Sequence, residues 1–449
     1  MKRKIYQQLL DWKNNSQGKS ALLIEGARRV GKSYIVEEFA KKEYETYLLI
    51  DFNIAPLEIK ALFDNYLQDL DTFFLFLSTF YGKKLYPRKS LIIFDEVQMF
   101  PKARSTIKYL VQDGRYDYIE TGSLLSFKEN VKDILIPSEE IHLKMHPMDF
   151  EEFLWAMGNE VLFDFLRDCF TKHKPLGQTM HRKAMDLFRQ YLLVGGMPQV
   201  VNEYIKTKDF SKAIEAQKLI LNLYRADISK HAKTDKRKCE RILDVLPSQL
   251  SKHEKRFNLS AIKKGARYRD YETAFYWLDD AMILNTAYNA TMSSAALKLN
   301  LEASSFKCYM LDTGLLFALT LEMDTKLQVD LYQKILFGKL NLNEGMFLEN
   351  IVAQILVANN HPLYFYSKSS NKAEDRMKID FLISKNEVTS KHNICPIEVK
   401  SSPRYTLSSL NKFQIKFKNE LSTPYVIHPS DLKEENGIVY LPFYMTPLL

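Results

Sequence analysis

Cysteine is scarce in this 449-residue sequence, which has four, and no two of them form a C-x-x-C pair. That spacing fits neither a zinc site nor a disulfide framework, and it favours a reducing compartment. Long apolar runs are also missing. The N-terminal stretch contains no h-region of a signal peptide, and the most apolar segment, Phe73 to Phe80, is too short to span a bilayer. We therefore expect a cytoplasmic protein that does not cross a membrane.

Neither sign of charge dominates the composition. The 63 Lys and Arg exceed the 55 Asp and Glu, which gives a formal net charge of +8. This mild basic bias permits contact with nucleic acid without requiring it. Apolar residues at 46% and charged residues at 26% are typical of a soluble globular protein. Because no repeat is evident, a chain of this length is expected to form roughly two to four domains.

The first 150 residues alternate short apolar runs with amphipathic stretches. This alternation is typical of a doubly wound α/β domain, in which each apolar run is a buried strand of a parallel sheet. The expected strands are 21–25, 46–51, 90–95, 116–121 and 140–145.

Three segments follow, with boundaries expected near 150, 235 and 335. Residues 151–235 have an almost wholly helical pattern, which breaks at Gly195-Gly-Met-Pro198. Residues 236–335 hold Lys- and Arg-rich helices and then short strand-like runs. Residues 336–449 have the pattern of a second α/β unit. The expected helix and strands of this last unit are 344–358, 363–366, 378–383, 395–400 and 424–428.

A phosphate-binding motif lies between the first expected strand and the helix after it. Gly26 to Ser33 matches G-x-x-x-x-G-K-[ST] in full, in the strand–loop–helix context that the mechanism needs. Glycine lets backbone N–H groups approach phosphate oxygens, and the helix directs its positive end at the same anion. We expect ATP and Mg²⁺ here, with Lys32 at the β/γ-phosphates and the Ser33 hydroxyl on the metal. The expected nucleotide-binding residues are Gly26, Ala27, Arg28, Arg29, Val30, Gly31, Lys32, Ser33 and Tyr34.

Acidic residues end the third expected strand. Asp95 would stand at the carboxyl edge of the sheet, beside the phosphate-binding loop, and could hold Mg²⁺. Glu96 is the expected general base that orients and deprotonates the attacking water. Thr121 and Ser123 end the next strand, where a hydroxyl could sense the γ-phosphate. Taken alone, Asp-Glu after an apolar run is more often only a strand leaving the core, but its place after the phosphate-binding loop, with one strand between, favours the metal-binding interpretation. No arginine finger can be assigned.

Further motifs accompany these elements in a fixed order. They are Glu120-Thr-Gly-Ser123, His146-Pro-Met-Asp-Phe-Glu-Glu-Phe153, Gly195-Gly-Met-Pro198, Lys307-Cys-Tyr-Met-Leu-Asp-Thr-Gly-Leu315 and Glu344-Gly-Met-Phe-Leu-Glu349. With the phosphate-binding loop and Ile93-Phe-Asp-Glu-Val-Gln98, this set resembles a large prokaryotic family of AAA+-type P-loop ATPases described as "ATP-binding protein". The resemblance covers nearly the whole chain. It implies an ASCE P-loop core, a helical lid, a winged helix and a C-terminal domain similar to the restriction-endonuclease fold. Ser33 stands where Thr is more usual, and either hydroxyl can bind Mg²⁺.

The last segment carries a D…E-x-K pattern. Glu398 and Lys400 are two residues apart on an expected strand, so both side chains leave on one face, and Asp380 lies on the preceding strand. Two such carboxylates can bind Mg²⁺ while the lysine positions water, and Glu349 could complete the set. The pattern resembles the PD-(D/E)XK nucleases. Strand-edge charges are often only solvated, however, and such folds also serve as binding modules without activity.

Basic residues concentrate in the middle of the chain, over positions 230–267. Residues 258–264 and 271–278 can be read as helix–turn–helix, with 279–284 leading into a wing, so the lysines and arginines could bind DNA or RNA phosphates. The second helix is aromatic and acidic, which favours packing over base reading, and Phe275, Tyr276 and Trp277 are expected in the core. A solvated basic surface is the alternative. The basic residues are Lys230, Lys233, Lys236, Arg237, Lys238, Arg241, Lys252, Lys255, Arg256, Lys263, Lys264 and Arg267.

Three functions fit these observations. The first is an ATP-driven enzyme whose nuclease-like C-terminal domain engages nucleic acid. The second is an ATP-driven regulatory switch with a non-catalytic, partner-binding C-terminal domain. The intact set of Asp380, Glu398 and Lys400 favours the first of these over the second. The third is a nucleotide-binding scaffold, which Glu96 argues against because a scaffold has no use for an activated water. The oligomeric state stays open.

Overall fold

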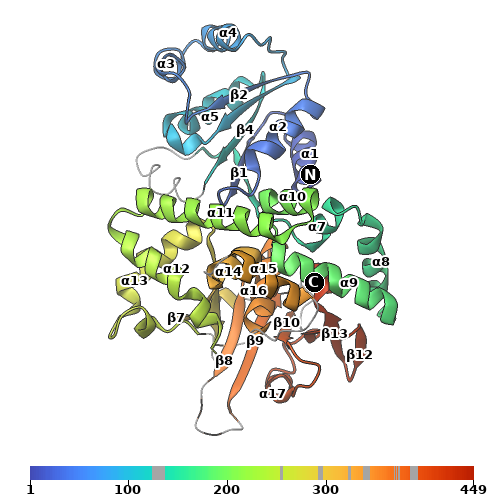
Figure 1. Ribbon diagram of the computed structural model, residues 1–449. Coiled ribbons are helices and arrows are strands. Elements are labelled where there is room, and N and C mark those ends of the chain that lie inside the picture. The colour runs from blue at the N-terminus through green and yellow to red at the C-terminus, as the bar shows by residue number, and fades with distance from the viewer. Residues whose placement is uncertain are drawn as a thin grey trace. The chain divides into compact units, whose positions relative to one another are not determined.

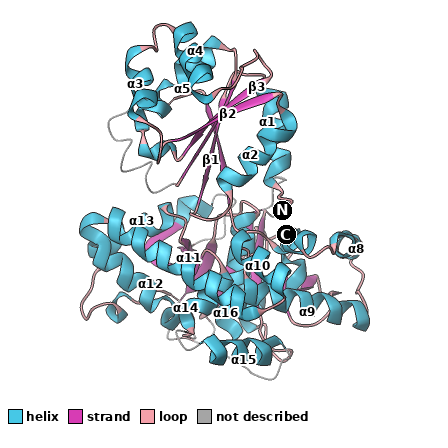
Figure 2. Cartoon of the chain, turned by 45° about the horizontal axis from the view of Figure 1, so that its top comes forward, coloured by secondary structure: helices cyan, strands magenta, loops and turns pink. Residues whose placement is uncertain are grey.

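The computed structural model describes residues 1–123, 137–252, 256–291, 297–321, 325–336, 344–368, 370, 372, 375–384 and 393–449. The chain divides into two compact units (Figures 1 and 2). The first holds Met1–His146 with Asp280–Met282, and the second holds Pro147–Asp279 with Ile283–Leu449. The boundary expected near 150 therefore lies close to a division between units. Residues near 235 and 335 both lie inside the second unit, and the division into four domains stays a prediction.

A five-stranded parallel sheet forms the centre of the first unit. Its strand order is β2-β3-β4-β1-β5, so β4 lies between β1 and β3. Every residue of β1, β3 and β4 is buried, as expected for parallel strands that are covered on both faces. All five strands lie where the sequence predicts them, within one residue. They are β1 (Ala21–Gly26), β2 (Thr46–Asp51), β3 (Ser90–Asp95), β4 (Asp117–Gly122) and β5 (Glu140–Met145).

Helices flank this sheet, as Figure 2 shows in cyan beside the magenta strands. One face of the sheet packs on α3, α4 and α5 through an apolar cluster that includes Phe52, Phe63, Phe73 and Phe94. Edge-to-face ring pairs join these residues, with centroids 5.1 to 5.8 Å apart. The helices are α1 (Ile5–Ser16), α2 (Lys32–Glu43), α3 (Leu57–Asn65), α4 (Leu70–Tyr81) and α5 (Pro101–Asp113), with a 3₁₀ turn η1 (Val97–Met99).

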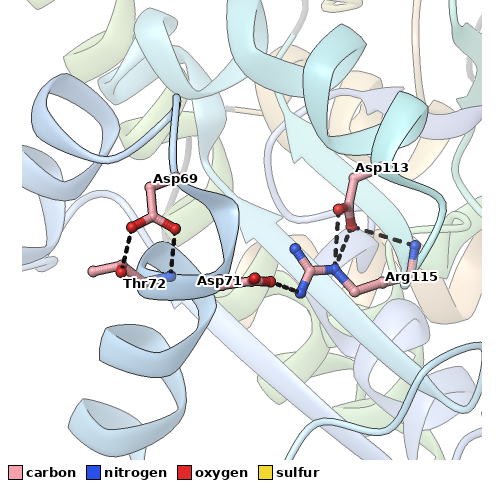
Figure 3. Close-up of polar contacts among 5 residues, drawn as sticks. All are labelled: Asp69, Asp71, Thr72, Asp113 and Arg115. Atoms are coloured by element: carbon pink, nitrogen blue, oxygen red, sulfur yellow. Dashed lines mark hydrogen bonds and ion pairs between the residues drawn. The ribbon is translucent and has the colours of Figure 1, made fainter.

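Charged contacts hold the start of α4 (Figure 3). Asp69 caps the helix, because its carboxylate accepts a hydrogen bond from the Thr72 backbone N–H at 3.1 Å and another from the Thr72 hydroxyl at 2.6 Å. Arg115 follows α5 and donates to Asp71 at 2.6 Å and to Asp113 at 2.8 Å. Arg115 therefore joins the first turn of α4 to the end of α5.

The second unit begins with helices, as the sequence predicts for residues 151–235. A capping box begins α7, in which the Asp149 side chain accepts a hydrogen bond from the Glu152 N–H at 2.9 Å. Further along the chain, Pro247 lies inside α12. The helices of this part are α7 (Phe150–Ala156), α8 (Glu160–Thr171), α9 (Gln178–Val194), α10 (Pro198–Thr207), α11 (Phe210–His231), α12 (Lys236–Leu250) and α13 (Tyr268–Asp280), with 3₁₀ turns η2 (Lys233–Asp235) and η3 (Leu259–Ala261).

A mixed eight-stranded sheet follows, in the order β12-β13-β11-β10-β9-β8-β6-β7. Strands β6 and β7 form an antiparallel hairpin, and β6 also pairs with β8 in parallel, so residues before 335 share one sheet with the C-terminal strands. The strands are β6 (Leu284–Ala290), β7 (Leu301–Met310), β8 (Tyr364–Lys368), β9 (Met377–Ser384), β10 (Ile394–Val399), β11 (Tyr425–His428), β12 (Lys433–Glu435) and β13 (Ile438–Pro442). The accompanying helices are η4 (Leu297–Asn300), α14 (Thr313–Thr320), α15 (Thr325–Leu336), α16 (Glu344–Ala358), α17 (Ser408–Lys416) and η5 (Phe443–Leu448).

All four cysteines are buried and free. Across the described ranges, no helix combines the length and apolar character that crossing a membrane requires.

Candidate functional site

The phosphate-binding motif forms the turn between β1 and α2. Gly31 has φ 98° and precedes the first residue of the helix, while Arg29 also adopts the left-handed region at φ 72°. Gly26 is required for a different reason, because a Cβ there would lie 2.5 Å from the Met145 carbonyl oxygen at the end of β5. The backbone thus curls tightly at the N-terminus of α2, where unpaired helix N–H groups and the helix dipole favour an anion.

Lys32 lies against this loop and is 6% exposed. Its ammonium donates to the Gly26 carbonyl at 3.0 Å and to the Ala27 carbonyl at 3.2 Å. Burial lowers the pKa of Lys32, and the nearby Glu96 and Asp95 carboxylates oppose that effect. The loop therefore carries a cation that could exchange two carbonyl contacts for stronger contacts with phosphate oxygens.

Ser33 and Asp95 meet at the carboxyl edge of the sheet. The Ser33 hydroxyl donates to Asp95 Oδ1 at 2.8 Å, although 62 positions separate the two residues in sequence. Thr121, at the end of β4, donates to the same carboxylate oxygen. The meeting follows from the strand order, because β3, β4 and β1 are parallel neighbours in that order, so their carboxyl ends lie at the same edge of the sheet. Oxygen donors of this kind are the ligands that Mg²⁺ prefers.

Glu96 directly follows β3 in a constrained conformation. Its φ of 53° is in the left-handed region, which is uncommon for a residue with a side chain. Its backbone N–H donates to the Thr121 hydroxyl at 3.4 Å, and its carboxylate accepts a hydrogen bond from the Gln98 amide. Gln98, which was not among the expected site residues, thus orients the candidate base.

Arg3 is a second residue that the sequence did not single out. It is 7% exposed, and its guanidinium donates to the Val30 carbonyl at 2.9 Å and to the His146 carbonyl at 2.6 Å. It therefore joins the phosphate-binding loop to the segment after β5. Burial lowers the pKa of His146 to about 4, with smaller contributions from Lys144 and Arg3.

The other expected nucleotide-site residues differ in exposure. Ala27 and Val30 are buried and pack the inside of the loop. Arg28 and Arg29 are exposed, and Tyr34 is 53% exposed on the first turn of α2. Ser123 lies one residue beyond β4 and is half-buried.

The expected acidic residues of the last segment lie on neighbouring strands. Ile397 of β10 is opposite Phe381 of β9, so Glu398 and Asp380 face each other at the next position along the antiparallel pair. Asp380 accepts from the Val399 backbone N–H at 3.0 Å. Lys400 forms an ion pair with Glu398. Burial raises the pKa of Glu398, and Lys400 opposes that shift.

Lys307 of β7 completes this cluster and was not among the expected site residues. It is 1% exposed, and its ammonium lies 2.9 Å from Glu349 Oε1 and 3.9 Å from Asp380 Oδ1. The Tyr309 hydroxyl also donates to Glu349 Oε1, at 2.5 Å. The ammonium stands 4.9 Å from the Phe365 ring centroid.

The carboxylates of this cluster have partners within the protein. Glu349 already accepts from an ammonium and a hydroxyl at one oxygen, and Asp380 accepts from a backbone N–H. Lys307 and Lys400 supply positive charge beside these carboxylates. Among the residues that the structure describes, no group of three or more His, Cys, Asp or Glu side chains could hold a metal ion.

The basic middle region differs from its expected form in two respects. Residues 258–264 contain a short 3₁₀ turn in place of a helix, whereas residues 271–278 lie in α13. Phe275 and Trp277 are buried, but Tyr276 is 49% exposed, so its expected place in the core was wrong. Its position on the outer face of an amphipathic helix explains the difference. Lys255 and the side chain of Lys233 lie outside the described residues.

Two glycine-containing motifs meet in the core of the second unit. The Gly196 N–H donates to Asp312 Oδ2 at 2.6 Å, and a Cβ on Gly196 would lie 2.0 Å from the Met148 carbonyl oxygen. Gln354 of α16 donates to the same carboxylate at 3.4 Å. Burial raises the pKa of Asp312 to about 6, and its backbone hydrogen bonds oppose the shift. These motifs build a buried junction of α9, α10, α14 and α16.

Comparisons with family models match three parts of the chain. Residues 18–154 match a family described as "AAA domain". Residues 185–326 match a domain of unknown function (DUF8612), and residues 344–445 match another (DUF4143). A search of curated proteins found none that matches the chain.

Several solved structures are similar at low identity. The Walker-type ATPase PABY2304 of Pyrococcus abyssi is 17% identical with a TM-score of 0.39, covering 71% of this chain and 95% of that chain. The Aeropyrum pernix ORC1 protein, solved in complex with DNA, is 11% identical with a TM-score of 0.27, covering 75% and 93%. The STAND protein PH0952 of Pyrococcus horikoshii, which has a tetratricopeptide repeat sensor, is 12% identical with a TM-score of 0.27, covering 80% and 49%.

The parallel sheet, the turn at the start of α2 and the match to an AAA domain agree on one class. The first unit has a P-loop fold, and an AAA-type P-loop ATPase function is supported. The family models that match the rest of the chain describe domains of unknown function.

Proposed function

We propose that the first unit binds Mg²⁺·ATP and hydrolyses it. The observation that carries this proposal is the 2.8 Å contact between Ser33 and Asp95 beside a buried Lys32. In the proposed complex Lys32 contacts the β/γ-phosphates, while Ser33 and Asp95 hold Mg²⁺, whose charge would offset that of the phosphates. The backbone of Gly26 to Ser33 surrounds the phosphates, with Tyr34 at the start of the helix.

Glu96 is the proposed general base. Gln98 and the Thr121 hydroxyl fix its side chain and backbone, so its carboxylate is oriented before a water arrives. The Thr121 hydroxyl also donates to Asp95, so Thr121 could sense the γ-phosphate through this carboxylate. Ser123 is a second hydroxyl at this strand end.

Substitution of Lys32 tests nucleotide binding. Lys32→Ala should weaken binding of a fluorescent ATP analogue by at least about 10-fold, since a charge-assisted hydrogen bond contributes roughly 1.5–3 kcal/mol. Lys41→Ala, on an exposed position of the same helix, is the matched control and should bind as the wild type does. Equal affinities for the two variants, with both folded by circular dichroism, would remove the nucleotide site from this loop.

We further propose that α16 to β11 form a restriction-endonuclease-like domain. The order helix–strand–strand–strand–helix–strand supports this, as do the antiparallel β8–β9 and β9–β10 pairs and the parallel β10–β11 pair. Helices α12 and α13 with the β6–β7 hairpin are consistent with a winged helix, and α7 to α11 with a helical lid.

We propose that this C-terminal domain binds a partner without cleaving it, which makes the chain an ATP-driven regulatory switch. The support is Lys307, whose ammonium lies against two of the carboxylates that a nuclease would use for metal. The alternative is a nuclease, favoured by the facing positions of Asp380 and Glu398 with Lys400 beside them. Incubation of wild type and Asp380→Ala with plasmid DNA and Mg²⁺ or Mn²⁺ decides between them. We expect the plasmid to stay intact with both proteins. Cleavage by the wild type that Asp380→Ala abolishes would support the nuclease alternative instead.

A further inference from the structure

A polar pocket of about 640 Å³ opens in the second unit, between the end of α12, the η3 turn and the start of β7. None of its lining residues belongs to the carboxylate cluster of β9 and β10. Its lining includes Lys252, Arg256, Ser260, Ser304 and Ser305.

Both walls of the pocket are anchored in the core. The Phe257 N–H donates to the Phe306 carbonyl at 2.8 Å, and the two rings are stacked with centroids 5.8 Å apart. Phe306 also packs edge-to-face on Phe275 of α13, at 4.9 Å. On the other side, the Asn258 N–H donates to Gln249 of α12 at 3.0 Å. The segment that carries Arg256 and Ser260 is therefore fixed against the strand that carries Ser304 and Ser305.

The groups in the pocket match a phosphate. Lys252 and Arg256 supply positive charge, and the serines Ser260, Ser304 and Ser305 also line the pocket. Ser305 is 2% exposed, and its Oγ has no hydrogen-bond partner among the described residues. A buried hydroxyl left without a partner costs about 1–3 kcal/mol, so a ligand that supplies an acceptor would recover that energy. The one acid in the lining, Glu302, accepts from the Asn289 amide at 3.0 Å.

A second basic pocket, of about 310 Å³, adjoins the first. Ala266 lines both pockets, and the second is lined also by Lys238, Lys263 and Lys264, together with Asp270 and Tyr271. Two neighbouring basic hollows suit a ligand with phosphates at successive positions better than a ligand with a single phosphate.

We propose that these two pockets bind consecutive phosphodiester groups of a nucleic-acid strand. This rests on the proposed function, because it assigns the partner class of the regulated half of the chain. Lys252 and Arg256 bind one phosphate while Ser305 donates to it, and Lys263 and Lys264 bind the next. Contacts of this kind position the backbone and read no base sequence.

Fluorescence anisotropy of the full chain with labelled duplex DNA, and with RNA of the same sequence, tests this. The double variant Lys252→Ala/Arg256→Ala should bind at least about 10-fold more weakly and lower the slope of log affinity against log salt by roughly one, because it removes the contact with one phosphate. The matched control is Arg182→Ala/Lys183→Ala, which removes the same two residue types from exposed positions of α9 outside the pocket lining. It should bind as the wild type does.

Ser305→Ala separates binding from folding. Removal of an unpartnered buried hydroxyl should leave the melting temperature equal or higher, yet weaken binding by about 3- to 10-fold if that hydroxyl donates to phosphate. Equal loss in both double variants, or no loss in either, overturns the proposal. So does binding to anionic vesicles or a phosphopeptide but to neither nucleic acid. ATP turnover is measured on the same samples. If the protein hydrolyses ATP but does not bind nucleic acid, this inference is overturned and the ATPase proposal is unaffected.

Discussion

Replacing Arg3 by methionine should loosen the phosphate-binding loop from the end of the sheet. The guanidinium donates to the Val30 and His146 carbonyls at 2.9 and 2.6 Å, and hydrogen bonds to a charged group contribute about 1.5–3 kcal/mol each. Loss of both bonds removes roughly 3–6 kcal/mol, and relief of a buried charge offsets part of that. We expect a net destabilisation of about 2–4 kcal/mol, which for a unit of this size lowers the melting temperature by roughly 5–15 °C.

Differential scanning fluorimetry and titration with a fluorescent ATP analogue measure the effect. Affinity should fall with stability, because Val30 belongs to the loop that surrounds the phosphates. Arg29→Met is the control for stability: its side chain is exposed, so the change should stay within about 0.5 kcal/mol. If Arg3→Met melts and binds nucleotide like the wild type, Arg3 does not hold the loop and the reasoning is refuted.

Three other changes test the packing and charges of both units. Gly314→Ala should cost about 3 kcal/mol in urea unfolding, because its Cβ would lie 2.5 Å from the Val194 carbonyl oxygen; a neutral result would contradict that packing. The low pKa of His146, about 4, means that the unfolded chain binds more protons between pH 4 and about 6.5. The free energy of unfolding should therefore be highest above about pH 6.5 and fall by up to about 3 kcal/mol as the pH is lowered towards 4. His146→Gln should reduce this pH dependence, and a melting series with the same pH dependence as the wild type would disprove the assignment. Lys307→Met should lower the free energy of unfolding by about 3–5 kcal/mol, because it leaves the Glu349 carboxylate buried without its cation. The double variant Lys307→Met/Glu349→Gln should lose much less, whereas additive losses would mean that the two side chains are not coupled.

The first unit could be predicted from the sequence in some detail, because its signals are local. Apolar runs locate each parallel strand within one residue, and the G-x-x-x-x-G-K-S spacing locates the turn before α2. The meeting of Ser33 with Asp95 follows from a general rule, since parallel strands end at one edge of the sheet. Their roles in catalysis stay predictions.

Contacts between distant segments could not be predicted in the same way. Arg3 contacts carbonyls 27 and 143 positions away, and a carbonyl acceptor leaves no mark in the sequence. The pairing of β6 with β8 likewise joins segments that were expected in different domains. Lys307 belongs to a recognised motif, but its contact with Glu349, 42 positions later, appears only in the folded chain.

ATP hydrolysis by Glu96→Gln, with nucleotide affinity measured on the same preparation, tests the central claim most directly. The substitution keeps the shape of the side chain and removes its basicity, so affinity should stay within about 3-fold while turnover falls by roughly 10²-fold or more. Turnover at the wild-type rate, or a wild type that binds ATP but does not hydrolyse it with Mg²⁺, in the presence or absence of DNA, would contradict the account.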